Sequence, residues 1–222
     1  MIINNGFIFD MDGTLVDNMM IHHKAWQIKL KELGLDYTLE EVRQTIHGKN
    51  EEILARLFGE KYTPLQRKQF AEEKEAAYRE VSKQDLYAIK GLDFFLISAS
   101  KQKIPMGIGT AAPPENVAHG LEILQLEKHF QTVVDASQVS KGKPDPEVFL
   151  RVAHRMNVTI EQCLVFEDSP VGVATALNAG CNAVVITSTH TKEEFSHFPN
   201  VKKFIHDYSE ISIAEALSFI GK

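Results

Sequence analysis

The chain has 222 residues, of which 44% are hydrophobic and 24% are charged, a composition typical of a globular protein that buries a sizeable core. Its net charge of -6 argues against a nucleic-acid partner, because such proteins normally present a basic face. No stretch is apolar for long enough to cross a bilayer, and the short, uncharged N-terminus does not resemble a signal peptide, so we expect a cytoplasmic protein with no membrane partner.

The first predicted element is an apolar strand at 6–9, followed by two carboxylates one residue apart, Asp10 and Asp12. Residues i and i+2 of a strand project to the same side, so both side chains can face one point. Gly13 then lets the backbone turn without a Cβ penalty. Two like charges this close usually have a cation between them, and open α/β sheets bind ligands at their strand ends. We therefore interpret the pair as a functional site rather than a solvated loop.

The stretch 17–85 has helical periodicity and no clear strand, which predicts an all-helical insert. Apolar spacing predicts a first helix from Ile21 to Leu33, and a helix or a helical pair from Val42 to Leu57. A capping box predicts a further helix from Thr63 onward. The insert directly follows the acidic loop, so we interpret it as a cap over the active site. We expect its hinges at 17–19 and 82–86.

Short apolar runs alternate with helical patterns in the rest of the chain. The expected strands are 105–109, 132–134, 164–166, 183–187 and 203–205. This alternation predicts βαβ units and a parallel sheet that helices cover on both faces, which is an α/β fold.

Three further polar motifs follow predicted strands. Thr110 can offer a hydroxyl and a backbone N–H to a phosphate oxygen, although capping of the next helix is an equally good interpretation. Lys143, in a stiff Gly/Pro turn, is a positioned charge suited to a phosphoryl group. Glu167 and Asp168 form a second acidic pair. Because Mg²⁺ prefers oxygen ligands and typically takes one or two carboxylates plus substrate phosphate, these motifs together predict a magnesium and phosphate site.

Two other functions fit parts of the pattern. Residues 107–112 match G-x-G-x-x-A, the turn of dinucleotide-binding proteins, but Pro113 and Pro114 remove two N–H groups that would face a pyrophosphate. Receiver domains, which accept a phosphoryl group in signalling, hold similar residues around Mg²⁺. Their motifs come in another order, and they have no large cap.

In this order, the motifs resemble the four motifs of the haloacid dehalogenase superfamily: 10–17, Thr110, Lys143-Pro144 and Glu167-Asp168. The insert resembles the small α-helical cap of the β-phosphoglucomutase-like phosphatases. The resemblance implies a Rossmann-like, doubly wound parallel sheet as the catalytic core, residues 1–16 and 86–222, with an α-helical cap at 17–85.

The resemblance also implies roles for the motif residues. Asp10 would be the nucleophile that forms an aspartyl-phosphate, and Asp12 the general acid and base. Thr110 and Lys143 would hold the phosphoryl oxygens. The metal ligands would be Asp10, the backbone carbonyl of Asp12, and Asp168, with Glu167 assisting. The second acid, Asp12, favours phosphoryl transfer over carbon–halogen cleavage, because true dehalogenases lack it.

Phosphatase and phosphomutase are harder to separate. His22 and Lys74 resemble cap residues of the mutase, but its arginine after a cap glycine is replaced here by Lys49, and its Ser-Lys after the second motif by Ala112-Pro113. We therefore favour a monomeric phosphatase of a small phosphorylated metabolite, with sugar phosphates as the leading class and the mutase as the alternative. The expected substrate-binding residues are His22, Trp26, Gly48, Lys49, Lys74 and Ala111.

Overall fold

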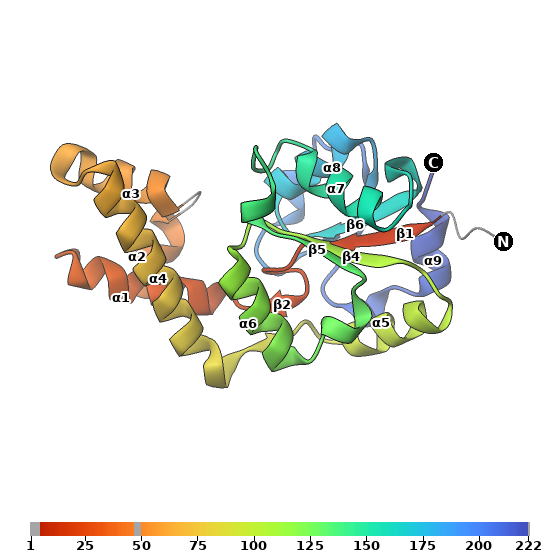
Figure 1. Cartoon of the computed structure of the whole chain (residues 1–222), viewed down its shortest axis with the longest axis horizontal. Coiled ribbons are helices and arrows are strands. Elements are labelled where there is room, and N and C mark those ends of the chain that lie inside the picture. Colours follow the sequence, from red (N-terminus) through yellow and green to blue (C-terminus); the bar gives the residue numbers. More distant parts are fainter. Residues whose placement is uncertain (1–4, 47–49, 222) are drawn as a thin grey trace. The chain divides into compact units, whose positions relative to one another are not determined.

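The structure is a computed structural model, and it describes residues 5–46 and 50–221. Contacts within the chain separate two compact units. One comprises Met1–Asp17 and Tyr87–Lys222, and we call it the sheet unit. The other, Asn18–Leu86, we call the helical unit. Figure 1 labels most of the helices and strands of the two units.

Six parallel strands form the centre of the sheet unit, in the order β5-β4-β1-β6-β7-β8. Their bounds are β1 (Gly6–Phe9), β4 (Met106–Gly109), β5 (Thr132–Val134), β6 (Cys163–Glu167), β7 (Asn182–Ile186) and β8 (Val201–Ile205). The chain adds β4 and β5 on one side of β1, and β6, β7 and β8 on the other. β1 and β6 therefore flank the point where the strand order reverses, which is where open α/β sheets bind ligands.

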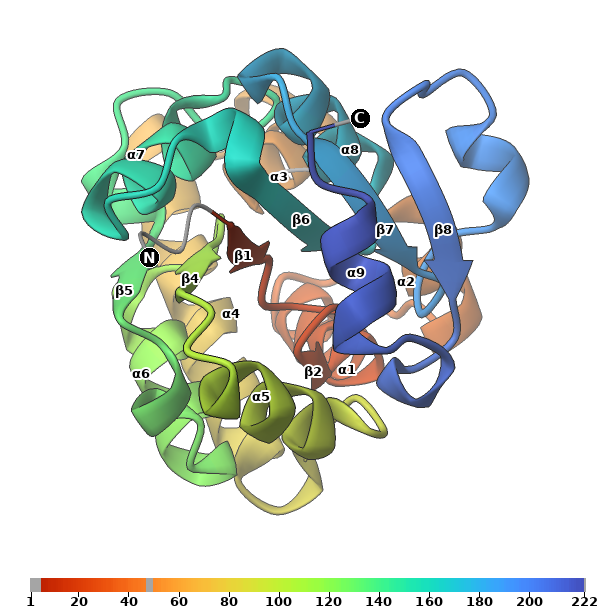
Figure 2. The ribbon, with the colours of Figure 1, turned by 90° about the vertical axis from the view of Figure 1, so that its right-hand side faces the viewer.

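Helices cover both faces of this sheet, which confirms the predicted α/β class (Figures 1 and 2). The helices of the sheet unit are α5 (Leu92–Lys101), α6 (Pro114–Leu124), α7 (Glu147–Arg155), α8 (Pro170–Ala179) and α9 (Ile213–Ser218). Short 3₁₀ turns lie at Glu127–His129, Ala136–Gln138, Ile160–Gln162, Lys192–Phe195 and Tyr208–Glu210. Strand alternation separates two cores: Ile8 joins the aliphatic cluster of α7 and α8, while Phe7 and Phe9 contact Phe95 of α5.

Two short strands were not predicted. β2 (Val16–Asp17) pairs antiparallel with β3 (Tyr87–Ala88). A two-residue strand is too short to show an alternating pattern, so the sequence carried no signal for it. The hinges expected at 17–19 and 82–86 fall largely on regular elements, because Asp17 belongs to β2, α1 begins at Met19 and α4 continues to Asp85.

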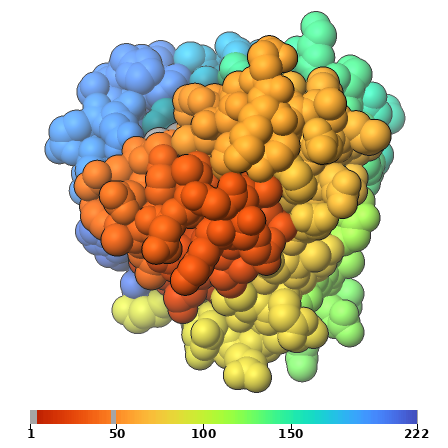
Figure 3. Space-filling view, turned by 90° about the vertical axis from the view of Figure 1, so that its left-hand side faces the viewer, coloured from red at the N-terminus to blue at the C-terminus, as the bar shows by residue number. Residues whose placement is uncertain are grey.

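Four helices and one 3₁₀ turn form the described part of the helical unit. Figure 3 shows one face of the molecule as a space-filling view, with this unit in red-orange to yellow. They are α1 (Met19–Glu32), α2 (Leu39–Thr45), α3 (Asn50–Phe58), the turn Gly59–Lys61, and α4 (Pro64–Asp85). The region expected to be a helix or a helical pair is thus two helices. α4 begins as predicted, because Thr63 and Gln66 form a capping box. Over residues 5–46 and 50–221, each helix is either too short or too polar to cross a membrane.

Candidate active site

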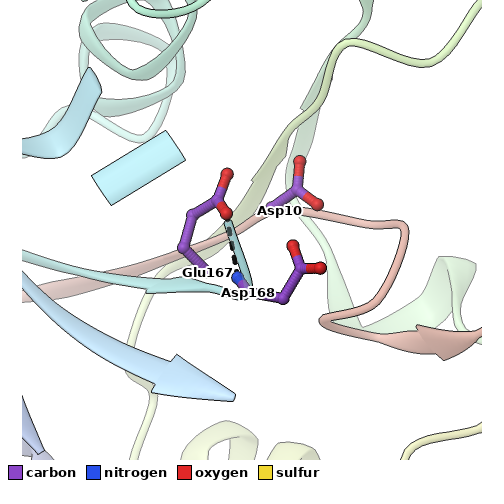
Figure 4. A group of neighbouring side chains, drawn as sticks. All are labelled: Asp10, Glu167 and Asp168. Atoms are coloured by element: carbon purple, nitrogen blue, oxygen red, sulfur yellow. Dashed lines mark hydrogen bonds between the residues drawn. The ribbon is translucent and has the colours of Figure 1, made fainter. Parts of the chain in front are cut away.

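Three buried carboxylates meet where β1 and β6 end (Figure 4). Asp10 directly follows β1, Glu167 is the last residue of β6, and Asp168 follows it. They are 7%, 1% and 5% exposed, and each offers an oxygen within 4.8 Å of the others. Adjacent parallel strands bring their carboxyl ends together, so two motifs far apart in the sequence meet at one point.

Lys143 is buried beside these acids. Its Nζ donates to Asp10 Oδ1 at 2.7 Å and to Glu167 Oε1 at 2.5 Å. One ammonium faces three carboxylates, so two negative charges remain when all three acids are ionised. A divalent cation would neutralise that charge, and carboxylate oxygens are suitable ligands for Mg²⁺. The residues present therefore fit a divalent metal.

The pKa values of these acids differ although the acids are adjacent. Burial raises the pKa of Asp10 to about 8, since the opposing effect of Lys143 is smaller and Glu167 adds to the rise. Burial, Glu167 and Asp10 together also raise the pKa of Asp168. Burial acts in the same direction on Glu167, but Lys143 and the donors of Ser169 outweigh it and lower the pKa. Lys143 thus keeps Glu167 ionised, whereas the fold disfavours the charged forms of Asp10 and Asp168 unless a cation is present.

Glu167 is held by donors at the start of α8. Its Oε2 accepts from the backbone N–H groups of Asp168 at 2.8 Å and Ser169 at 2.9 Å, and from the Ser169 hydroxyl at 2.9 Å. Ser169 also caps α8 by accepting from the N–H of Gly172 at 3.1 Å. A Cβ atom on Gly172 would lie 1.6 Å from Glu167 Oε1, so the glutamate occupies the space that a side chain would fill.

We expect Gly172→Ala to destabilise the protein by at least about 1–3 kcal/mol, because the added methyl group overlaps a buried carboxylate. Alanine is normally the better helix former by about 1 kcal/mol, so a loss of stability identifies the clash. The measurement is the free energy of unfolding in urea. Val171→Ala, at an exposed position of the same helix, is the control. A Gly172→Ala protein at least as stable as wild type would contradict the packing described for Glu167.

Glu147, the first residue of α7, holds the loop that carries Lys143. Its Oε2 accepts from the backbone N–H groups of Ser140 at 2.8 Å and Lys141 at 3.0 Å, and its Oε1 accepts from Arg151 at 2.6 Å. The Ser140 hydroxyl, the Lys141 N–H and Arg151 lower the pKa of Glu147 to about 2. Glu147 was not predicted from the sequence, where its only signal is an acid at the start of a helix.

Thr110 lies directly after β4 and is buried. Its backbone N–H donates to the carbonyl of Val134 at 3.0 Å, and its hydroxyl oxygen accepts from the N–H of Ala112 at 3.1 Å. The prediction that this N–H faces a phosphate was wrong, because Thr110 still continues the β4–β5 ladder. The hydroxyl does not cap α6 either, since Pro113 is the N-cap. The adjacent Ala111 is exposed.

The glycines of the G-x-G pattern have a packing role. A Cβ atom on Gly107 would lie 2.5 Å from Val152 Cγ1, and one on Gly109 would lie 2.8 Å from Phe149 Cδ1. Both glycines lie inside β4 and let α7 approach the sheet closely. The two glycines that match a dinucleotide-binding turn are thus explained by the close packing of α7 on β4.

Asp12 lies in the turn after β1 and is half-buried. The next residue, Gly13, has φ 76°, a left-handed conformation that favours glycine. A Cβ atom on Gly13 would also lie 2.2 Å from Asp168 Oδ2, so the turn passes directly against the second acidic motif. The loop after β7 contacts the same place: Ser188 Oγ donates to the carbonyl of Gly13 at 2.5 Å, and the Thr189 hydroxyl donates to Asp168. Neither Ser188 nor Thr189 was predicted from the sequence.

Three of the predicted substrate-binding residues contact one another inside the helical unit. Lys74 Nζ donates to His22 Nδ1 at 2.9 Å and lies 5.7 Å from the centre of the Trp26 ring. Lys74 and Trp26 are 2% and 3% exposed. Gly48 and Lys49 lie outside the described residues. A role of these five residues in substrate binding stays a prediction.

The chain is similar to known proteins in sequence and in fold. The model of the haloacid dehalogenase-like hydrolase family matches residues 7–186. A phosphorylated carbohydrates phosphatase of Thermotoga maritima is 32% identical over 182 residues, which cover 80% of this chain and 82% of that protein. A fructose-1-phosphate phosphatase of Escherichia coli K12 is 32% identical over 179 residues, which cover 81% of this chain and 94% of that protein. The crystal structure of a HAD hydrolase, family IA, variant 3, from Entamoeba histolytica matches with a TM-score of 0.91 at 27% identity, covering 98% of this chain and 100% of that one.

Proposed function

Because the chain belongs to the haloacid dehalogenase-like hydrolase family, we propose that it is a Mg²⁺-dependent phosphatase that works through an aspartyl-phosphate on Asp10. That the chain is a hydrolase of phosphate esters follows from the family and from its phosphatase relatives. The observation that carries the finer proposal is the buried cluster of Asp10, Glu167 and Asp168, whose negative charge one lysine only partly neutralises. The names of the two relatives support a sugar phosphate as the substrate class.

The carboxylates differ in how far they are free to hold a metal. Both oxygens of Glu167 already accept hydrogen bonds, from Lys143 on one side and from the start of α8 on the other. We therefore assign the metal to Asp10, Asp168 and the backbone carbonyl of Asp12, with Glu167 holding Lys143. When bound, Mg²⁺ would neutralise phosphate charge and orient the phosphoryl group.

The protein residues would divide the chemistry into two displacements. A carboxylate oxygen of Asp10 attacks phosphorus, the ester P–O bond breaks, and Asp12 gives a proton to the leaving oxygen. Water then attacks the phosphorus of the aspartyl-phosphate, Asp12 takes a proton from that water, and the bond to Asp10 breaks to release phosphate. Lys143 would donate to the phosphoryl oxygens. The Thr110 hydroxyl, whose oxygen accepts from Ala112, would donate its hydrogen to them as well. Positioning and charge stabilisation would then supply most of the catalysis.

Phosphate release from a panel of phosphorylated metabolites tests this function. We expect sugar phosphates to be hydrolysed with Mg²⁺, activity to disappear when a chelator removes the metal, and activity to return when Mg²⁺ is added in excess. The control is the same chelator already saturated with Mg²⁺. Release that continues undiminished under exhaustive chelation would exclude a metal-dependent site.

A sugar phosphomutase is the second candidate, favoured by the contact between His22 and Lys74, residues that resemble the mutase cap. The two functions give different products from β-glucose 1-phosphate in the presence of glucose 1,6-bisphosphate. A phosphatase releases inorganic phosphate. A mutase forms glucose 6-phosphate without net phosphate release.

A further inference from the structure

We propose that Thr189 is a positioning residue that orients Asp168 for the divalent cation. The loop after β7 would then be a third, uncharged part of the metal site, beside the acidic ends of β1 and β6. This inference rests on the proposed function, because it assigns a metal to Asp168.

The Thr189 hydroxyl has two acceptors within reach on Asp168, the carboxylate oxygen Oδ2 and the backbone carbonyl. The Thr189 hydroxyl donates to Asp168 Oδ2, and the backbone carbonyl of Asp168 lies farther from it, at 3.2 Å. A hydroxyl has a single hydrogen to donate, and the nearer carboxylate is the stronger acceptor. Asp168 Oδ1 takes no part in this contact. One carboxylate can therefore serve the threonine through Oδ2 and a cation through Oδ1.

The loop is held in place by the two residues directly before this contact. Before it, Thr187 donates its backbone N–H to the carbonyl of Ile205 at 2.8 Å, and Ser188 donates its hydroxyl to the carbonyl of Gly13 at 2.5 Å. Thr189 Cγ2 also lies 3.2 Å from the position of a Cβ atom on Gly13. The hydroxyl of Thr189 is thus presented to Asp168 from a loop that is itself bonded to β8 and to the turn after β1.

Orientation matters here because Asp168 is surrounded by like charge. Its carboxylate offers an oxygen within 4.8 Å of those of Asp10 and Glu167, and when these acids are ionised to take a metal, their repulsion favours rotation of Asp168 away from them. A hydrogen bond from Thr189 opposes this rotation. Groups that hold a metal ligand in place typically change metal affinity by about 10–100-fold when they are removed.

The test is the affinity of the full chain for Mg²⁺, measured by titration calorimetry without substrate. We expect Thr189→Val, which keeps the shape and removes the donor, to raise the Kd for Mg²⁺ by about 10–100-fold. Thr189→Ser, which keeps the donor, is expected to stay within about threefold of wild type. Turnover of Thr189→Val is expected to recover at saturating Mg²⁺, which a general structural defect would not allow. Thr191→Val is the matched control, because its hydroxyl bonds to Glu194 of the same loop.

Thermal melts of each variant establish that it is folded, and Thr189→Ala replaces the valine variant if valine does not fold. Asp168→Asn shows whether Asp168 holds the metal at all. If wild type and Thr189→Val bind Mg²⁺ equally well while Asp168→Asn binds it more weakly, the role of Thr189 is overturned and the metal site stands. Wild-type protein that binds no Mg²⁺, or binds it as well after Asp168→Asn, would overturn the proposed metal site and this inference with it.

Discussion

Asp10→Asn is expected to abolish turnover of a phosphomonoester, with a loss of about 10⁴-fold or more, as when other nucleophiles are removed. An amide has the shape of the carboxylate but is not a nucleophile toward phosphorus, so no acyl phosphate can form. The measurement is the initial rate of phosphate release at saturating Mg²⁺. Acid quench with a labelled substrate would show a phosphorylated protein for wild type and none for the variant.

The loss would not come from unfolding. The pKa of Asp10 lies at about 8, well above its ordinary value of 3.8, so the charged form is disfavoured in the metal-free fold. Protonated Asp10 therefore contributes stability below pH 3.8 that disappears as the pH rises through 8. The amide of the variant does not titrate. Without metal, the Tm of Asp10→Asn should therefore rise relative to the Tm of wild type as the pH increases from 3.8 to about 8. Asp17→Asn, at an exposed position of β2, is the control. If Asp10→Asn kept more than about a tenth of the wild-type activity, Asp10 would not be the nucleophile.

Lys143→Met is expected to lower turnover by about 10²–10³-fold, the usual effect of removing one donor that stabilises developing charge. It should also destabilise the metal-free protein by about 3–5 kcal/mol, because Asp10 and Glu167 lose their buried partner. Mg²⁺ should bind at least as tightly as in wild type, since a competing positive charge has gone. The measurements are phosphate release, unfolding in urea with and without Mg²⁺, and calorimetric titration of Mg²⁺.

The opposite effects on metal affinity separate Lys143 from the metal ligands. Asp168→Asn should weaken Mg²⁺ binding, whereas Lys143→Met should not. Lys141→Met is the matched control, because Lys141 lies on the same loop with an exposed side chain whose ammonium is 3.8 Å from Asp145. If Lys143→Met and Lys141→Met had equal stability and equal turnover, Lys143 would have no role in the site.

The four central strands could be predicted because they are short, mostly apolar runs with nearly all residues buried, whereas the edge strands β5 and β8 are only partly buried. The capping box of α4 was also visible, since Thr63, Pro64 and Gln66 act within one turn of helix. The pair β2 and β3 could not be predicted, because each strand has two residues and its partner lies far along the chain. The donor role of the Thr110 N–H was wrong for a related reason, since the competing acceptor, Val134, belongs to another strand.

The sequence by itself determined the acids at the ends of β1 and β6, the lysine in its Gly/Pro turn, and the family they resemble, because these signals are local in the chain. Only the tertiary structure decided which side chains form ion pairs and hydrogen bonds with one another. Lys143 joins Asp10 to Glu167, Gly172 leaves space for that glutamate, and Thr189 reaches Asp168 from the next strand's loop. Such contacts depend on strand order and helix packing, which place residues far apart in sequence a few ångströms from one another.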